Sequence, residues 1–180
     1  MRTSSLICIA TFLAGCAATM DAMTPSTSVI KDEFDGKMIV RQPPVNAASS
    51  MSEAFHTLGF EWTEKFPDSI FITVGFATDY RNIQDVAFNV DGKIIDKIKT
   101  ASALTDHQYT GTFRSSYRRF EMGFDDFQMV ANGKDVKMRV GGINEYTVSS
   151  FGPSAGHGVA IVNTKFVPFL DQVRPLRRKP

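Results

Sequence analysis

Residues 86–94 read VAFNVDGKI, and this stretch indicates the fold more firmly than any other part of the chain. Apolar residues alternate with others up to Asp91-Gly92, and Ile94 and Ile98 continue the apolar series beyond that pair. Such alternation is typical of a strand with one buried face. Asp-Gly between two runs favours a two-residue turn, because both positions take positive φ angles that suit the twist of paired strands. We therefore predict a β-hairpin here.

Alternating runs on both sides of this hairpin predict further strands. Residues 66–69, Phe-Pro-Asp-Ser, separate two of these runs and indicate a second hairpin. In the later runs, Lys137 and Arg139 occupy the outward positions between apolar residues. The predicted strands are residues 58–63, 70–76, 118–124, 136–140 and, more weakly, 144–150.

Two stretches carry the period of a helix. Asp125 is expected to cap a short helix through Asn132, with Gly133 in the left-handed position after its end. Near the carboxyl terminus Pro168 interrupts a longer apolar stripe, and an internal proline costs about 3 kcal/mol. We therefore expect a kink there, or two pieces with the second starting near Lys165. The stripe consists of Val159, Val162, Phe166, Phe169, Leu170 and Val173.

The bulk composition is that of one globular domain. The chain has 180 residues, of which 43% are hydrophobic and 22% charged, and 15 are phenylalanine. This is enough apolar surface to form a core without disulfides or metals. Residues 31–173 are therefore predicted to form a single α+β domain, a twisted and mostly antiparallel β-sheet with a C-terminal helix packed on one face.

The charge distribution argues against a nucleic-acid-binding protein. The formal net charge is +1, but residues 16–173 hold 15 basic and 19 acidic side chains, a net charge of −4. The excess of basic residues is confined to the last seven positions. A domain that binds nucleic acid usually carries positive charge on its folded surface, so we expect no nucleic-acid partner.

The amino terminus has the layout of an export signal. Residues 6–13, LICIATFL, form an apolar run that is too short to span a bilayer, which takes roughly 20 apolar residues. The run ends in Leu13-Ala14-Gly15-Cys16, which resembles the lipobox of bacterial lipoproteins at all four positions. The resemblance implies removal of residues 1–15 and attachment of lipid to Cys16. Several acyl chains would then hold the protein on a membrane.

The resemblance also implies an address. In bacterial lipoproteins an aspartate after the lipidated cysteine favours the inner membrane, whereas this chain has Ala17. We therefore expect a cell-envelope location, on the outer membrane facing the periplasm. Cys8 lies in the removed segment, so the mature chain would have no free thiol. Residues 16–30 are small and polar, and are predicted to form the lipidated cysteine and a flexible tether.

The sequence predicts no metal or other cofactor. His56, His107 and His157 lie about 50 residues apart, and none belongs to a pair with metal-ligand spacing. The default expectation for each histidine is a surface or capping residue.

Residues 151–158, FGPSAGHG, are the most unusual local sequence, and two interpretations stay open. The glycines can cradle an anion at a helix start, with Ser154 or His157 as nucleophile or base. The stretch lacks the spacing of a P-loop or a nucleophile elbow, however. A flexible connection into the last helix is the favoured interpretation.

Two groups of basic residues are candidate contacts for anionic glycans or lipids. The first is Arg114, Arg118 and Arg119, for which charged, solvent-facing positions on an edge strand are the stronger alternative. The second lies in the tail, residues 174–180, which is expected to be a disordered end or to contact an anionic surface or an envelope protein. Its candidate residues are Arg177, Arg178 and Lys179.

Two function hypotheses follow from these observations. The leading one is a membrane-anchored, non-catalytic binding or accessory module of the cell envelope, because a strong anchor signal stands beside no recognisable catalytic motif. The alternative is a small envelope hydrolase that uses Ser154 and His157.

Overall fold

The computed structural model describes residues 24–177, except residues 51, 78, 111–112 and 156–159. Its strands form two sheets in which all neighbours are antiparallel. Two helices, α2 and α3, pack on the strands, so the predicted α+β class is confirmed. The strands are divided between two sheets, which the sequence pattern did not indicate.

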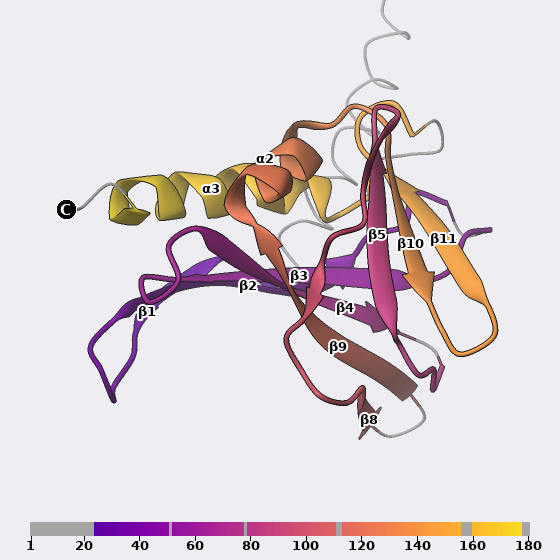
Figure 1. Cartoon of the computed structure of the whole chain (residues 1–180), viewed down its shortest axis with the longest axis horizontal. Coiled ribbons are helices and arrows are strands. Elements are labelled where there is room, and N and C mark those ends of the chain that lie inside the picture. The colour runs from indigo at the N-terminus through magenta and orange to yellow at the C-terminus, as the bar shows by residue number, and fades with distance from the viewer. Residues whose placement is uncertain (1–23, 51, 78, 111–112, 156–159, 178–180) are drawn as a thin grey trace, which may run out of the picture.

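The larger sheet, sheet A, has the order β1-β2-β3-β4-β9-β7, and β8 also pairs with β9. Its strands are β1 (Ser28–Lys31), β2 (Met38–Asn46), β3 (His56–Thr63), β4 (Ser69–Phe76), β7 (Lys99–Thr100), β8 (Asp106–Thr110) and β9 (Phe113–Gly123). The smaller sheet, sheet B, has the order β11-β10-β5-β6. Its strands are β5 (Asp85–Val90), β6 (Lys93–Ile95), β10 (Val136–Gly141) and β11 (Tyr146–Phe151). Figure 1 shows sheet B beside sheet A, with its strands at a steep angle to β2 and β3.

The Asp91-Gly92 turn joins β5 to β6 as predicted, with φ angles of 50° and 91°. The expected faces beyond the turn are wrong, however. Ile94 is 65% exposed and Ile95 is buried, and the strand ends before Ile98. The two-residue turn pairs Asn89 with Ile94, which places both side chains on the outer face of sheet B.

The predicted hairpin of residues 58–76 is also confirmed, as β3 and β4. Its partner β9 begins five residues before the predicted start. One row of paired residues crosses sheet A and faces the core, because Phe60 pairs with Ile72 and Ile72 pairs with Phe120. All three side chains are buried. This register gives sheet A one apolar face for the helices.

Helix α2 (Phe124–Asn132) forms where predicted, but both predicted end signals are wrong. Asp125 lies in the first turn, and Gly123 precedes the helix without a side-chain cap. Gly133 has φ −64°, so it is extended rather than left-handed. A Cβ atom there would lie 2.6 Å from side-chain carbons of Val90 and Val136, so close packing accounts for the glycine.

Helix α3 (Asn163–Arg177) begins two residues before Lys165, near which the second piece was predicted to start, and it continues through Pro168. Val162, in the first part of the predicted stripe, precedes the helix. Pro168 lies on its exposed side. The apolar stripe continues past the proline on the opposite side. Burying each such side chain contributes about 1.5–3 kcal/mol, which offsets a local cost of about 3 kcal/mol. The buried stripe is Phe166, Phe169, Leu170 and Val173.

A cluster of aromatic rings joins the layers. The rings of Phe166 and Phe169 in α3 lie 5.1 and 5.0 Å from the ring of Phe60 in β3. Phe127 of α2 packs against the same group. Phe151 of sheet B stacks on Phe166 at 6.1 Å. One core therefore connects both helices and both sheets.

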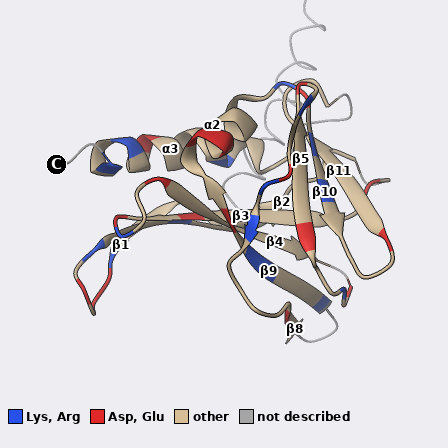
Figure 2. Ribbon diagram, viewed as in Figure 1, with Lys and Arg blue, Asp and Glu red and all other residues tan. Residues whose placement is uncertain are grey.

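The predicted tether and tail are both partly folded. Ser28–Lys31 form β1 rather than part of a coil, and Thr27 donates a hydrogen bond to Gln42 at 2.8 Å. At the other end α3 continues to Arg177, so only residues 178–180 of the predicted tail lie outside the described residues. Figure 2 shows the basic residues of this last turn at the carboxyl-terminal end of α3.

Candidate functional site

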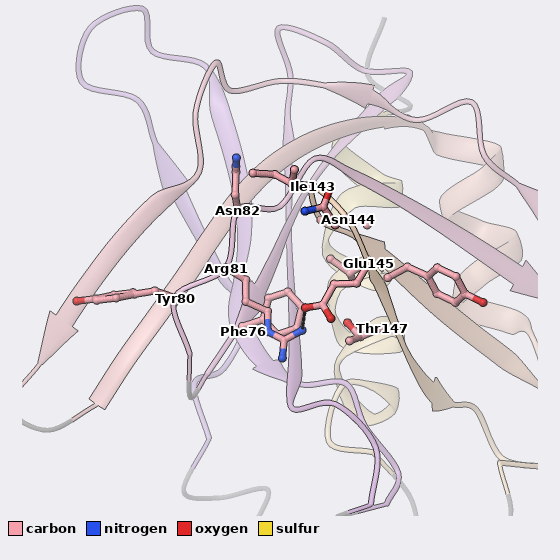
Figure 3. Close-up of a pocket in the computed structure, with 12 residues that line it drawn as sticks. Phe76, Tyr80, Arg81, Asn82, Ile143, Asn144, Glu145 and Thr147 are labelled. Carbon is pink, nitrogen blue, oxygen red and sulfur yellow. Dashed lines mark hydrogen bonds and ion pairs between the residues drawn. The ribbon is translucent and has the colours of Figure 1, made fainter.

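A pocket opens at the seam where the two sheets meet. Strand β4 ends at Phe76, the connection to β5 crosses to sheet B, and the β10–β11 turn faces that connection. The pocket between them has a volume of about 280 Å³ and is lined by Phe76 and by residues 80–82 and 140–147 (Figure 3). We call this cavity the seam pocket.

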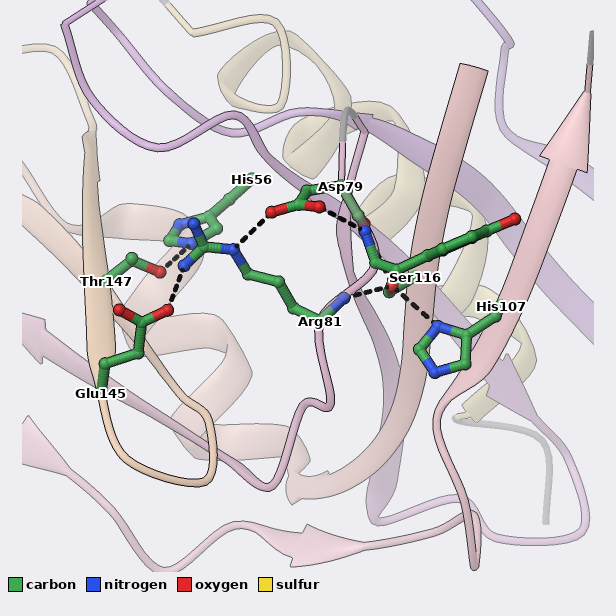
Figure 4. A network of polar contacts seen from close by, with 8 residues as sticks. His56, Asp79, Arg81, His107, Ser116, Glu145 and Thr147 are labelled. Carbon is green, nitrogen blue, oxygen red and sulfur yellow. Dashed lines mark hydrogen bonds and ion pairs between the residues drawn. The ribbon is translucent and has the colours of Figure 1, made fainter. Parts of the chain in front are cut away.

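Arg81 is the central side chain of the seam pocket. Its Nη1 donates to Glu145 Oε1 at 2.8 Å, and its Nε donates to Asp79 Oδ2 at 3.3 Å (Figure 4). The guanidinium carbon lies 5.1 Å from the centre of the Phe76 ring. The Arg81 backbone N–H also donates to Ser116 Oγ at 2.8 Å. Contacts to β4, β9 and the β10–β11 turn therefore fix the guanidinium before any ligand arrives.

His56 lies behind the wall of the pocket and is fully buried. Its Nδ1 is 2.8 Å from Ser149 Oγ, and its Nε2 is 2.9 Å from Thr147 Oγ1. Burial, together with the positive charge of Arg81, lowers the pKa of His56 to about 4. The imidazole is therefore neutral at pH 7, with one ring nitrogen donating and the other accepting. It holds Thr147, which lines the pocket.

Ser116 is the second polar group behind the pocket, and it is also fully buried. Its Oγ lies 3.0 Å from His107 Nδ1 and donates to the Asp79 carbonyl at 3.1 Å. The His107 ring packs edge-on against Tyr80. This hydroxyl is enclosed by protein groups, so it positions the connection between the sheets rather than reaching a substrate.

The predicted pair Ser154 and His157 is not brought into this pocket. Ser154 is exposed, and its backbone N–H donates to the Lys134 carbonyl at 2.9 Å. Gly152, just before it, has φ +105°, and a Cβ there would strike the backbone of Lys134. His157 lies outside the described residues, so the hydrolase hypothesis stays a prediction.

The three candidate arginines of β9 do not converge. Arg118 donates to the carbonyls of Ile83 and Ala103, at 2.5 and 3.2 Å. Arg119 lies on the opposite face of the strand, paired with Glu61. Arg114 is exposed, with its guanidinium 5.6 Å from the Tyr80 ring. Two of the three guanidinium groups are thus bound to this chain's own acceptors.

Among the candidate basic residues of the tail, Arg177 is also bound to acceptors of this chain. Arg177 donates to Asp68 Oδ1 at 2.8 Å and to the Pro67 carbonyl at 3.1 Å, and lies over the Phe124 ring at 4.1 Å. It therefore fastens α3 to the β3–β4 turn. Arg178, Lys179 and the predicted lipid-attachment residue Cys16 lie outside the described residues.

Sequence reasoning missed the residues that build the seam pocket. The default expectation of a surface or capping role is wrong for His56, which is buried between two hydroxyl groups. Arg81 and Glu145 are 64 positions apart, and no local motif links them. The predicted strand began at Leu58, and nothing in the sequence indicated that His56, the first residue of β3, faces β11.

Comparison with family models, with curated proteins and with solved structures finds no match to this chain. Over the described residues, no helix is both long and apolar enough to cross a membrane. In the same part of the chain, no three acidic, histidine or cysteine side chains are grouped as a metal site requires.

Proposed function

We propose that this chain is a lipid-anchored protein of the bacterial cell envelope, on the outer membrane facing the periplasm, and that it acts as a non-catalytic binding module. Its binding site is the seam pocket. The observation that carries the binding role is the Arg81 guanidinium, held by two carboxylates and an aromatic ring in the wall of an open cavity. Small-molecule sites are typically preformed cavities with a few fixed polar groups.

The chemistry of His56 favours binding over catalysis. In a hydrolytic triad a buried carboxylate orients the histidine and stabilises its protonated form. Here Ser149 occupies that place beside Nδ1, and the pKa of His56 is about 4. Such a histidine is a weak base at neutral pH and does not activate the Thr147 hydroxyl.

The binding role is tested by photo-crosslinking in intact cells, with a benzophenone amino acid in place of Tyr146 at the rim of the pocket. Tyr109 is the matched control, because the two residues are 67% and 66% exposed and Tyr109 lies on β8. We expect a specific adduct from position 146 and none from position 109. Identical adduct patterns, or none from position 146, would contradict the proposal.

The anchor is tested by mass spectrometry of the mature amino terminus and by membrane fractionation. Replacement of Cys16 by serine should abolish the acylated amino terminus, because serine has no thiol for thioether formation. Cys8→Ser is the matched control and should change neither acylation nor fractionation. A Cys16→Ser protein that is processed and fractionated like the unmodified chain would overturn the anchor.

A further inference from the structure

We propose that the seam pocket binds a neutral carbohydrate, a short stretch of a glycan chain without charged groups. This inference rests on the proposed function, because it names the ligand class of the same pocket. Four features of the described residues carry it: the polarity of the lining, the balance of charge, the unpaired polar atoms, and the two rim tyrosines.

The lining offers both polar and apolar surface to a ligand. Phe76 and Val140 are only 6% and 1% exposed, but Ile143 of the same lining is 65% exposed. Asn82, Asn144 and Glu145 are exposed at its mouth. A purely apolar ligand would desolvate these polar groups without forming hydrogen bonds to them, which costs free energy. A sugar avoids that cost through its hydroxyl groups and still presents C–H surface to Ile143.

The charges around the pocket are balanced, which disfavours an ionic ligand. Arg81 already pairs with Asp79 and Glu145. The adjoining hollow on the other side of the β10–β11 turn carries Arg139 and Asp85, and Arg114 lies over the Tyr80 ring, so three basic and three acidic side chains surround the pocket. An anion would compete with two carboxylates for the Arg81 guanidinium, and a cation would compete with Arg81 for Glu145. A neutral ligand binds without breaking these pairs.

Unpaired donors and acceptors lie side by side in the wall. Within the described part of the chain, Nη2 of Arg81 and Oε2 of Glu145 make no hydrogen bond, and neither does the Asn144 amide. Figure 3 shows the Arg81 and Glu145 side chains pointing toward one another. A hydroxyl group both donates and accepts, so neighbouring sugar hydroxyls can satisfy a guanidinium and a carboxylate together.

Size and the rim tyrosines point to more than one sugar unit. The pocket, at about 280 Å³, is near the lower end of the ~300–1,000 Å³ range of small-molecule sites. Tyr80 extends away from its centre in Figure 3 and is 42% exposed, while Tyr146 is 67% exposed. Arg114 and Arg139 lie against these two rings at 5.6 and 5.9 Å. Fixed aromatic rings beside the pocket suit the C–H faces of flanking sugars.

The test is calorimetric titration of the full mature chain, held in a detergent that has no sugar headgroup. The probes are neutral tri- to pentasaccharides of glucose, galactose and N-acetylglucosamine. Uronic-acid and glucosamine analogues of the same length and a neutral tetrapeptide serve as competitors. We expect saturable binding of at least one neutral oligosaccharide, and at least tenfold weaker binding of its charged analogues and of the peptide.

A pair of variants localises the binding. Glu145→Gln removes the acceptor charge beside Arg81 and should weaken binding of the neutral oligosaccharide at least tenfold, while improving binding of the uronic-acid analogue. Asp171→Asn is the matched control, because that exposed carboxylate pairs with Arg174 on α3, away from the pocket. It should leave both affinities unchanged. Circular dichroism verifies that both variants are folded.

Three outcomes would overturn the carbohydrate inference: no neutral oligosaccharide binds, the charged analogues or the peptide bind better, or Glu145→Gln leaves the affinity unchanged. The crosslinking at position 146 separates this failure from failure of the proposed function. An adduct at position 146 without oligosaccharide binding leaves a binding module with another ligand. Absence of the adduct removes the binding role itself.

Discussion

His56 is a residue whose surroundings set how stability depends on pH. Its pKa is about 4 in the folded chain and about 6.5 when unfolded. Between these values the unfolded state binds the proton and the folded state does not. The free energy of unfolding therefore holds its full value above pH 6.5 and falls by about 3 kcal/mol as the pH drops to 4.

The measurement is urea unfolding at several pH values between 7 and 4, with and without the histidine. His56→Gln should flatten the part of the pH dependence that this residue contributes, although the variant is less stable at pH 7. His107→Gln is the control, because His107 is exposed. If both variants lose the same share of the pH dependence, the assignment to His56 is wrong.

For single residues, the sequence predicted which face of a strand is buried better than it predicted contacts between distant residues. Alternation assigned Val136, Met138 and Val140 to the core, and all three are buried. It did not reveal that His56 meets Ser149, because the two residues are 93 positions apart. A partner at that distance is set by how two sheets pack, and a local period carries no information about that packing.

Among the elements, α3 shows how burial outweighs local propensity. Phe169 is fully buried, with its ring 5.0 Å from that of Phe60 and 5.5 Å from that of Phe127. Phe169→Ala should lower the free energy of unfolding by about 3–5 kcal/mol, because it leaves a cavity beside those two rings. Val167→Ala should change the free energy of unfolding by about 0.5 kcal/mol or less, because the Val167 side chain is 61% exposed on the other side of the same helix. Chemical denaturation measures both, and equal effects would contradict this packing.

Element boundaries were the least predictable feature, and in each case tertiary packing decided them. The sequence predicted a kink at Pro168 or two pieces, whereas the buried stripe of α3 carries one helix from Asn163 through the proline. It favoured a left-handed Gly133, but crowding by Val90 and Val136 explains that glycine. The Asp91-Gly92 turn was predicted correctly because its conformation depends on two adjacent residues.

For the whole molecule, the shared core predicts cooperative unfolding. Phe151 of sheet B stacks on Phe166 of α3, which stacks on Phe60 of sheet A. Trp62, the only tryptophan, reports on sheet A, and the methyl group of the buried Met138 reports on sheet B. Tryptophan fluorescence and methyl NMR should therefore give the same urea midpoint. Separate midpoints would show that the sheets unfold independently.

The division of the strands into two sheets could not be predicted from the sequence. Both sheets contain antiparallel hairpins with one apolar face, and their strands have the same alternation. The chain first passes from sheet A to sheet B, between β4 and β5, through the segment that contains Arg81, where no periodic pattern exists. The seam pocket forms at that crossing, so the sequence did not predict the pocket either.

Strand β1 has a mechanical consequence if the amino terminus is fixed to a membrane. It is an edge strand of four exposed residues, attached to the domain through β2 and through Gln42. A force applied from its amino-terminal side would peel β1 away before it disturbed the aromatic core. Four released residues at about 3.4 Å each would lengthen the connection between the membrane and the domain by about 14 Å. Release of the strand would thus limit the force that reaches the core, and β1 would pair with β2 again when the force is removed.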